Sequence, residues 1–342
     1  MSQLNPLPSD MIFHMMQFCD FDQMAVVMMV SCQWFGESLK FEFEKSYASI
    51  DRNNFSEICL HPSSLLITNL SISQATCSWD TLFELFSESK YLINLRSLSV
   101  HGRDETVNKI DKLFKGKTLK NLTYLDLDRV NIGDDGFKAL ADSPYIKNLI
   151  HLESFWGGNS YLTSKYISES ENFSKLTFID ISNTQKRNYE GYIHFCKSQF
   201  LSNLKSISFS NEADDTLMDL LTHNTYLTKL ERIYMDSGTF TPDGLKKYLN
   251  SENAKNITDL YLDYAELGDE GMKVIAECPN MTNLKELSIA NANISNVGAL
   301  YLLESKYLKN LTSLTHKSND PFYMGRDIDE EMDALLKQSF KN

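Results

Sequence analysis

The sequence contains few cysteines and no closely spaced pair of them. The six thiols lie far apart along the 342 residues, at Cys19, Cys32, Cys59, Cys77, Cys196 and Cys278. Six widely spaced cysteines in a chain of this length do not form the dense pattern of a disulfide framework, and none of them belongs to a CxxC pair. Reduced thiols are typical of intracellular proteins. We therefore expect the chain to act in the cytoplasm or the nucleus.

Long apolar runs are also missing. No stretch approaches the roughly 18 consecutive apolar residues that a membrane-spanning helix needs, and the opening MSQLNPLPSD has no Lys or Arg with which a secretion signal would begin. We expect no membrane partner. Basic residues are outnumbered too, since 33 Lys and Arg against 46 Asp and Glu give a net charge of −13. Such a chain repels nucleic acid, and a basic protein partner is favoured instead.

Catalytic motifs are absent from the sequence. It has no GxSxG, no glycine-rich phosphate loop and no HExxH. The pairs Cys59-x-His61 and His194-x-Cys196 are isolated, whereas zinc needs about four ligands. The carboxylates are spread along the chain rather than set as an acid–base pair. We expect no enzymatic activity, no metal and no cofactor.

What the sequence does contain is one phrase repeated in phase. The nine copies are NLRSLSV, NLTYLDL, NLIHLES, KLTFIDI, NLKSISF, KLERIYM, NITDLYL, NLKELSI and NLTSLTH. The second residue of each copy falls at positions 95, 122, 149, 176, 204, 230, 257, 284 and 311. A weaker copy starts near Ile67. The spacing L-x-x-L-x-L predicts a short strand with one buried face.

A second segment follows the strand in each copy, and it is clearest in NIGDDGFKALADSPYI, ELGDEGMKVIAECPNM and NISNVGALYLLESKYL. These stretches predict a helix with Asp or Ser as its N-cap. Gly136, Gly244, Gly271 and Gly298 occupy the same position of their copies. We expect the missing side chain to let the helix approach the strands.

One strand and one helix cannot bury their apolar faces alone, so such units stack. The pattern resembles the leucine-rich repeat family, and most closely its ribonuclease-inhibitor-like and cysteine-containing subtypes. The resemblance implies an α/β solenoid over residues 64–316, with about nine to ten strand–helix repeats of about 27 residues and a parallel sheet on the concave face. Residues 317–342 are expected to form a C-terminal cap or tail.

In this family the strand residues between the leucines face the concave surface. In this chain those positions combine aromatic rings with carboxylates, which suits the binding of a protein target and favours a basic one, in rate especially. The predicted substrate-binding residues are Tyr124, Asp126, Asp128, Glu153, Phe178, Asp180, Tyr234, Asp236, Tyr261 and Asp263. The alternative is that these positions are merely solvated, as in any soluble repeat protein.

Residues 7–34 read LPSDMIFHMMQFCDFDQMAVVMMVSCQW. Leu-Pro-x-Asp, an apolar helix and Val-Ser-x-x-Trp follow one another here, and over residues 4–44 the chain resembles an F-box, with a linker or N-terminal cap at 45–63. Cys19 stands where Leu is usual and Phe21 where Pro is usual. The alternative is that the segment only caps the solenoid, as a methionine-rich stripe is usually core. Some 40 residues cannot bury so much apolar surface alone, which favours a partner.

F-box proteins join a Skp-family adaptor, and through it a cullin, to a target protein. The resemblance implies a non-catalytic substrate-recognition subunit of an SCF-type E3 ubiquitin ligase that docks the adaptor through Leu7, Pro8, Ile12, Val30 and Trp34. Two alternatives stay open. One is a scaffold that engages no ligase, which includes an effector of an intracellular bacterium acting in the host cytosol. The other is a GTPase-activating repeat protein that uses Arg129.

Overall fold

The computed structural model describes most of the chain from residue 56 to residue 340. The described residues are 39–42 (backbone only), 56, 59–60, 64–65, 67–72, 78–102, 105–155, 157–158, 160–181, 189–211, 213–317 and 328–340. They belong to two compact units. Unit 1 runs to residue 158 and includes 171–175, and unit 2 consists of 159–170 and the chain from 176 onward. Apart from 39–42, the predicted F-box-like range lies outside the described residues.

Each of the nine predicted copies contains one strand, which begins two residues after the second residue of the copy. In unit 1 the strands are β1 (Leu39–Glu42), β2 (Ile67–Ile72), β3 (Ser97–Val100), β5 (Tyr124–Asp126) and β7 (His151–Glu153), and they pair in this order. In unit 2 they are β8 (Phe178–Asp180), β9 (Ser206–Ser208), β10 (Arg232–Tyr234), β11 (Asp259–Tyr261), β12 (Glu286–Ser288) and β13 (Ser313–Thr315), again in order. The pairings within each unit are parallel.

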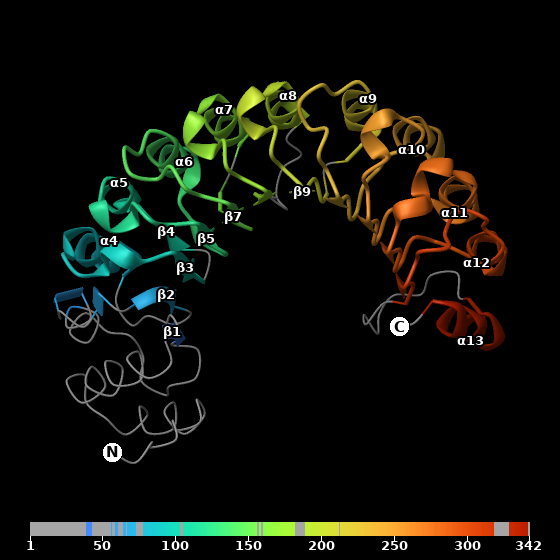
Figure 1. Ribbon diagram of the computed structural model, residues 1–342, viewed down its shortest axis with the longest axis horizontal. Coiled ribbons are helices and arrows are strands. Elements are labelled where there is room, and N and C mark those ends of the chain that lie inside the picture. The colour runs from blue at the N-terminus through green and yellow to red at the C-terminus, as the bar shows by residue number, and fades with distance from the viewer. Residues whose placement is uncertain are drawn as a thin grey trace, which may run out of the picture. The chain divides into compact units, whose positions relative to one another are not determined.

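The helices alternate with the strands and lie on one side of the sheet in each unit (Figure 1). Unit 1 holds α4 (Trp79–Glu88), α5 (Ile110–Phe114) and α6 (Gly133–Ala141), with a small side ladder of β4 (Glu105–Thr106) and β6 (Val130–Asn131). Unit 2 holds α7 (Tyr161–Glu169), α8 (Tyr189–Lys197), α9 (Asp215–Thr222), α10 (Pro242–Leu249), α11 (Gly268–Glu277), α12 (Asn296–Leu303) and α13 (Glu330–Ser339). The predicted α/β repeat architecture is thereby confirmed.

The core of each repeat is built by the leucine positions of the pattern. Leu125 and Leu152 of unit 1 and Leu260 and Leu287 of unit 2 are fully buried. Burying such a side chain contributes about 2 kcal/mol. In register they stack directly, since Leu125 pairs with Leu152 and Leu260 with Leu287. The apolar period of the sequence therefore sets both the strands and their register.

The strand β1 was not predicted from the sequence. It lies within the range 4–44 and pairs with β2 in parallel, with Phe41 opposite Leu70. The alternation in LKFEF was a signal for a strand that could have been used. The boundary at residue 44 between the F-box-like range and the linker stays a prediction.

Two details of the predicted helix starts are wrong. The N-caps of α6 and α11 are Ile132 and Leu267, and neither makes a side-chain cap bond; only α12 begins as predicted in these three copies, with Ser295 accepting from the N–H of Val297. The four glycines also do not lie against the strands, because an added Cβ would first meet side chains of a helix or of a helix start, such as Ile132 at Gly136, Asp215 at Gly244 and Leu267 at Gly271. A Cβ on Gly298 would lie 2.6 Å from Oδ1 of Asp269, on the preceding helix.

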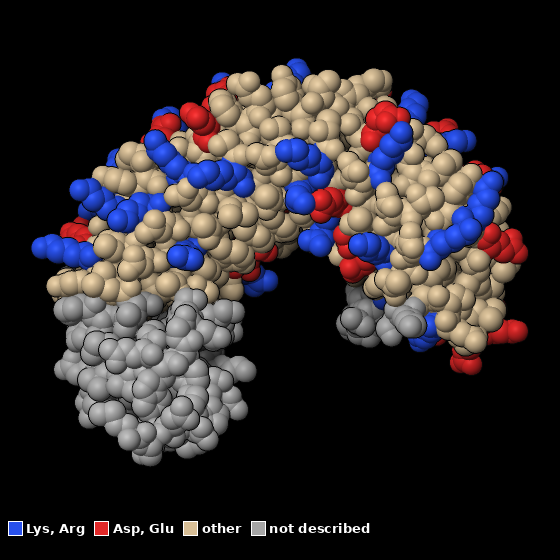
Figure 2. Space-filling model, viewed as in Figure 1, with Lys and Arg blue, Asp and Glu red and all other residues tan. Residues whose placement is uncertain are grey.

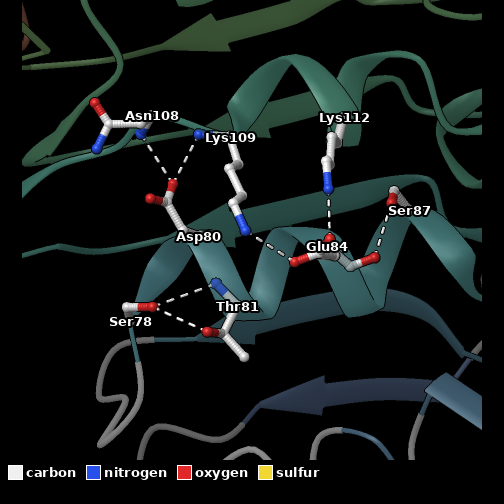
Figure 3. Close-up of polar contacts among 8 residues, drawn as sticks. All are labelled: Ser78, Asp80, Thr81, Glu84, Ser87, Asn108, Lys109 and Lys112. Carbon is white, nitrogen blue, oxygen red and sulfur yellow. Dashed lines mark hydrogen bonds and ion pairs between the residues drawn. The ribbon is translucent and has the colours of Figure 1, made fainter.

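Aspartates in the first turn of one helix bind the start of the next helix. Asp80 of α4 accepts hydrogen bonds from the N–H groups of Asn108 and Lys109, just before α5, at 2.8 and 2.7 Å (Figure 3). Beside it, Glu84 pairs with Lys109 at 3.1 Å and with Lys112. Asp215 of α9 binds Thr241, the N-cap of α10, in the same way. The free N–H groups of a helix start favour such an anion.

Where the repeated phrase begins with Asn, its side chain in most copies ties that copy to the preceding one. The side-chain amide of Asn121 donates to the carbonyl of Ile93 at 2.9 Å, and that of Asn283 donates to the carbonyl of Lys255 at 3.0 Å. A second set bridges two carbonyls, as Asn280 does with Leu249 and Ser251, both at 2.8 Å. These amides satisfy loop carbonyls that the strands and helices leave unpaired.

The helix α13 lies in the range expected for a C-terminal cap and contacts α12. Its Asp333 binds His316 at 2.7 Å, Lys317 at 2.6 Å and Lys337 at 3.0 Å. Burial alone would raise the pKa of this carboxyl, but the hydrogen bonds from Lys317, His316 and Lys337 together hold it well below its usual range. These contacts tie α13 to the two residues that directly follow β13.

Candidate functional site

All ten predicted substrate-binding residues lie on the strands or one turn beyond them. Tyr124, Asp126, Asp128 and Glu153 belong to unit 1, and Phe178, Asp180, Tyr234, Asp236, Tyr261 and Asp263 belong to unit 2. The parallel register places the strand residues of successive copies side by side. The site therefore consists of two clusters, and whether they bind a target stays a prediction.

The unit 1 cluster is built around an aromatic pair. The rings of Tyr124 and His151, on neighbouring strands, stack with centroids 4.3 Å apart and an interplanar angle of 18°. Nε2 of His151 lies 3.1 Å from a carboxylate oxygen of Glu153. From the preceding repeat, Nε2 of His101 lies 2.7 Å from Oδ2 of Asp126. These two histidines were not among the predicted site residues.

Burial changes the acid–base properties of this cluster. It raises the pKa of the Tyr124 hydroxyl to about 12, with the charges of Asp126 and Glu153 adding to the effect. It also raises the pKa of Asp128, helped by the neighbouring Asp126. Asp126 itself is only 7% exposed. Its carboxylate contacts His101 and accepts a hydrogen bond from the N–H of Asp128 at 3.0 Å.

The unit 2 cluster holds a second aromatic pair. Tyr234 and Tyr261 stack face to face with centroids 4.3 Å apart and an interplanar angle of 8°. Both rings are half-buried. Burial raises the pKa of both phenols, so at neutral pH the pair is an uncharged aromatic surface with two hydroxyl groups. Next to it, Nε of Arg232 lies 3.8 Å from Oδ2 of Asp259.

A chain of hydrogen bonds links the carboxylates beyond this stack. Asp236 accepts from the Ser210 hydroxyl at 3.2 Å and from the N–H of Asp263 at 3.0 Å. Asp263 accepts from the Ser288 hydroxyl at 2.6 Å and from the N–H of Ala290 at 2.8 Å. Burial, and after it the charge of Asp263, raises the pKa of Asp236 to about 6. Stacked aromatic rings bordered by fixed carboxylates suit a protein ligand with basic side chains.

The raised pKa of Asp236 predicts a pH-dependent effect of Asp236→Asn. In the unfolded chain an Asp has a pKa near 3.9. Because the folded pKa is higher, ionisation of Asp236 destabilises the folded protein. This destabilisation is absent below about pH 4 and fully developed above about pH 6. The asparagine keeps both hydrogen bonds, by accepting from Asp263 N–H and donating to the Ser210 hydroxyl. We expect it to stabilise the protein by about 1–2 kcal/mol at pH 7.5 and hardly at all at pH 4, as measured by urea unfolding.

The matched control is Asp243→Asn, at an exposed position on α10. It should leave the free energy of unfolding within about 0.5 kcal/mol of the starting protein at both pH values. If Asp236→Asn raised the free energy of unfolding equally at pH 4 and pH 7.5, ionisation of Asp236 would not destabilise the folded protein, and the prediction would be wrong.

The turns that follow β5, β9, β10, β11 and β12 share a backbone feature that was not predicted from the sequence. Arg129, Asn211, Ser237, Tyr264 and Asn291 all have positive φ, between 55° and 67°. In this conformation the N–H groups of the first four residues donate to carbonyls of the following repeat, as Tyr264 does to the carbonyl of Ala290 at 2.8 Å. The side chains of Arg129 and Tyr264 are exposed beside the two clusters. The sequence signal that could have been used is that these residues each lie seven positions after the second residue of their copy, where the strand has ended.

Chemical groups suited to catalysis are not assembled within the described residues. Burial raises the pKa of the Cys59 and Cys196 thiols to about 12, so neither forms a nucleophilic thiolate at neutral pH. No group of three or more His, Cys, Asp and Glu side chains there could hold a metal ion. No described helix is long and apolar enough to cross a membrane. The predicted adaptor-binding residues, Leu7, Pro8, Ile12, Val30 and Trp34, lie outside the described residues.

Comparison with known proteins agrees with this architecture. Three segments, residues 118–141, 253–276 and 280–303, match the family described as Leucine Rich repeat. A crystal structure of the Rad7 and Elc1 complex in yeast is similar with a TM-score of 0.52 and 15% identity, over 86% of this chain and 77% of that one. An internalin from Listeria monocytogenes has a TM-score of 0.43 and 16% identity, over 77% of each chain. No curated protein matches the sequence. The fold is a leucine-rich-repeat solenoid.

Proposed function

We propose that this protein is the substrate-recognition subunit of an SCF-type ubiquitin ligase. Its repeat strands bind the target protein, and its N-terminal F-box-like segment docks a Skp-family adaptor and, through it, a cullin. The protein makes and breaks no covalent bond. It raises the effective concentration of the target near the ubiquitin-loaded enzyme.

The observation that carries the target-binding half of the proposal is the stack of Tyr234 on Tyr261. Two rings 4.3 Å apart form a rigid aromatic surface that loses little conformational entropy on binding. The carboxylates of Asp236 and Asp263 lie one turn further along the same strands, held by hydrogen bonds. Fixed charges of one sign steer a basic ligand and select against an acidic one.

The adaptor-binding half rests on the sequence pattern from Leu7 to Trp34. The yeast Rad7 structure, which shares the fold, contains Rad7 in a complex with a second protein, Elc1. That complex supports the idea that a solenoid of this kind binds a separate partner protein. The departures at Cys19 and Phe21 favour the second candidate function, a protein-binding scaffold that engages no ligase.

Capture of a purified Skp-family adaptor distinguishes these functions. We expect the starting protein to retain the adaptor on an affinity column, and Leu7→Ala/Pro8→Ala to reduce the retained amount at least tenfold, because truncating buried interface residues costs about 1–2 kcal/mol or more. Leu60→Ala is the matched control, since Leu60 is an apolar residue with 63% exposure outside the pattern. Equal adaptor capture by the double variant and the starting protein would reject the ligase function and leave the scaffold.

A further inference from the structure

A second surface of unit 2 has the opposite charge to the strand clusters. The residues that immediately precede β9, β10, β11 and β12 line a hollow of about 480 Å³ at the edge where the strands begin. We name it the lysine hollow; it is lined by Lys205, Lys229, Glu231, Asn256, Thr258, Asn283, Lys285 and Asn310. Three lysines against one glutamate give this wall a positive charge within a chain whose net charge is −13.

The lysines of the hollow are only partly neutralised by the protein. Nζ of Lys205 lies 2.7 Å from Oε1 of Glu231, with both side chains about half exposed. Nζ of Lys229 donates to the amide oxygen of Asn203 at 2.7 Å. Among the described residues neither Lys229 nor Lys285 forms an ion pair, and both are exposed. On the face seen in Figure 2, lysine and arginine side chains lie interspersed with acidic ones over the repeats of unit 2.

The asparagines of the hollow add fixed hydrogen-bond donors. The side-chain amides of Asn256, Asn283 and Asn310 donate to the carbonyls of Thr228, Lys255 and Thr282 at 3.3, 3.0 and 2.7 Å. These bonds hold three amides in successive repeats, and each NH₂ group has a second N–H to offer. Ammonium groups and oriented amide donors together suit carboxylate oxygens of a ligand.

We propose that the lysine hollow binds an acidic segment, rich in Asp and Glu, of a partner protein. The volume of about 480 Å³ is within the range of ligand sites in proteins. The net charge of −13 opposes the approach of a long polyanion such as nucleic acid, whereas a short acidic segment meets mainly the local charge of the hollow. The site is separate from the Tyr234–Tyr261 cluster, and its ligand has the opposite charge.

The test measures fluorescence polarisation of a labelled oligoglutamate peptide with the full-length protein. We expect saturable binding that weakens as salt is added. Replacing Lys205, Lys229 and Lys285 together by glutamine should weaken binding about tenfold or more, since the loss of each exposed ion pair weakens binding about two- to fivefold. The three side chains are exposed, so the variant should keep its circular dichroism spectrum and its unfolding midpoint.

The matched control replaces Lys197, Lys246 and Lys247 by glutamine, which removes the same charge from helix positions of unit 2. It should bind the peptide within about twofold of the starting protein, because these lysines lie outside the hollow. An equal loss in both triple variants would mean that binding follows net charge alone, and the proposal would fail. It would also fail if a single-stranded oligonucleotide bound as tightly as the peptide through the same lysines. Neither outcome bears on adaptor capture, which tests a different part of the chain.

Discussion

Replacing Asp269 by alanine is expected to lower the free energy of unfolding of unit 2 by about 3 kcal/mol, with the damage centred on α12. Oδ1 of Asp269 accepts from the N–H groups of Ser295 and Gly298 at 2.8 and 3.0 Å, and Oδ2 accepts from the Ser295 hydroxyl at 2.6 Å. Hydrogen bonds to a charged group contribute about 1.5–3 kcal/mol each when buried, and partial exposure of the carboxylate reduces their sum.

The loss is local because each repeat contacts only its neighbours. Hydrogen exchange of the α12 amides should therefore quicken about a hundredfold, while amides of α9 keep their protection. Urea unfolding followed by circular dichroism gives the accompanying loss of stability.

Two companion variants sharpen the interpretation of Asp269→Ala. Asp269→Asn can still accept from both N–H groups and should lose less than half as much stability. Glu270→Ala removes the next acidic side chain, which is exposed and 4.0 Å from Lys273, and should cost less than about 0.5 kcal/mol. If Asp269→Ala costs no more than Glu270→Ala, the carboxylate does not hold the next helix.

The second large effect concerns the target binding that we propose for the repeat strands. Tyr234→Ala/Tyr261→Ala is expected to weaken binding of the target about a hundredfold or more, because truncation of a tyrosine at an interface centre costs about 2 kcal/mol or more and the two stacked rings act together. Under the proposed function, the target is first captured by proximity labelling with ligase activity blocked. Its dissociation constant is then measured by surface plasmon resonance with the starting and the variant protein.

Tyr226→Ala is the matched control for this experiment. Tyr226 is 39% exposed in the loop before β10 and lies outside the strand cluster. It should bind the target like the starting protein. Unchanged binding by the double variant, with its circular dichroism spectrum intact, would show that the target docks elsewhere. Asp236→Asn adds a separate comparison, since it should slow association with a basic target while stabilising the fold at pH 7.5.

The arrangement of strands and helices could be predicted because its causes are local and repeated. Leucines and isoleucines at fixed spacing are buried in every copy, independently of the residues between them. The copies at Leu122, Ile257 and Leu284 each form a strand in the expected register. Features that depart from the family pattern were harder to predict from the sequence. The strand β1 has no complete copy of the phrase, and the first-turn aspartates looked like caps of their own helices.

For the candidate site, the sequence by itself determined which residues share the strand face, because alternation along a strand decides which side chains avoid the core. Only the tertiary structure decided what they do there. Tyr234 stacks on Tyr261, His101 binds Asp126, and burial with the charge of Asp263 raises the pKa of Asp236. The same holds for the lysine hollow, whose lysines come from three separate copies. These polar contacts join residues about 27 positions apart in the sequence. The distances between such residues, and how deeply they are buried, are set only when the repeats stack.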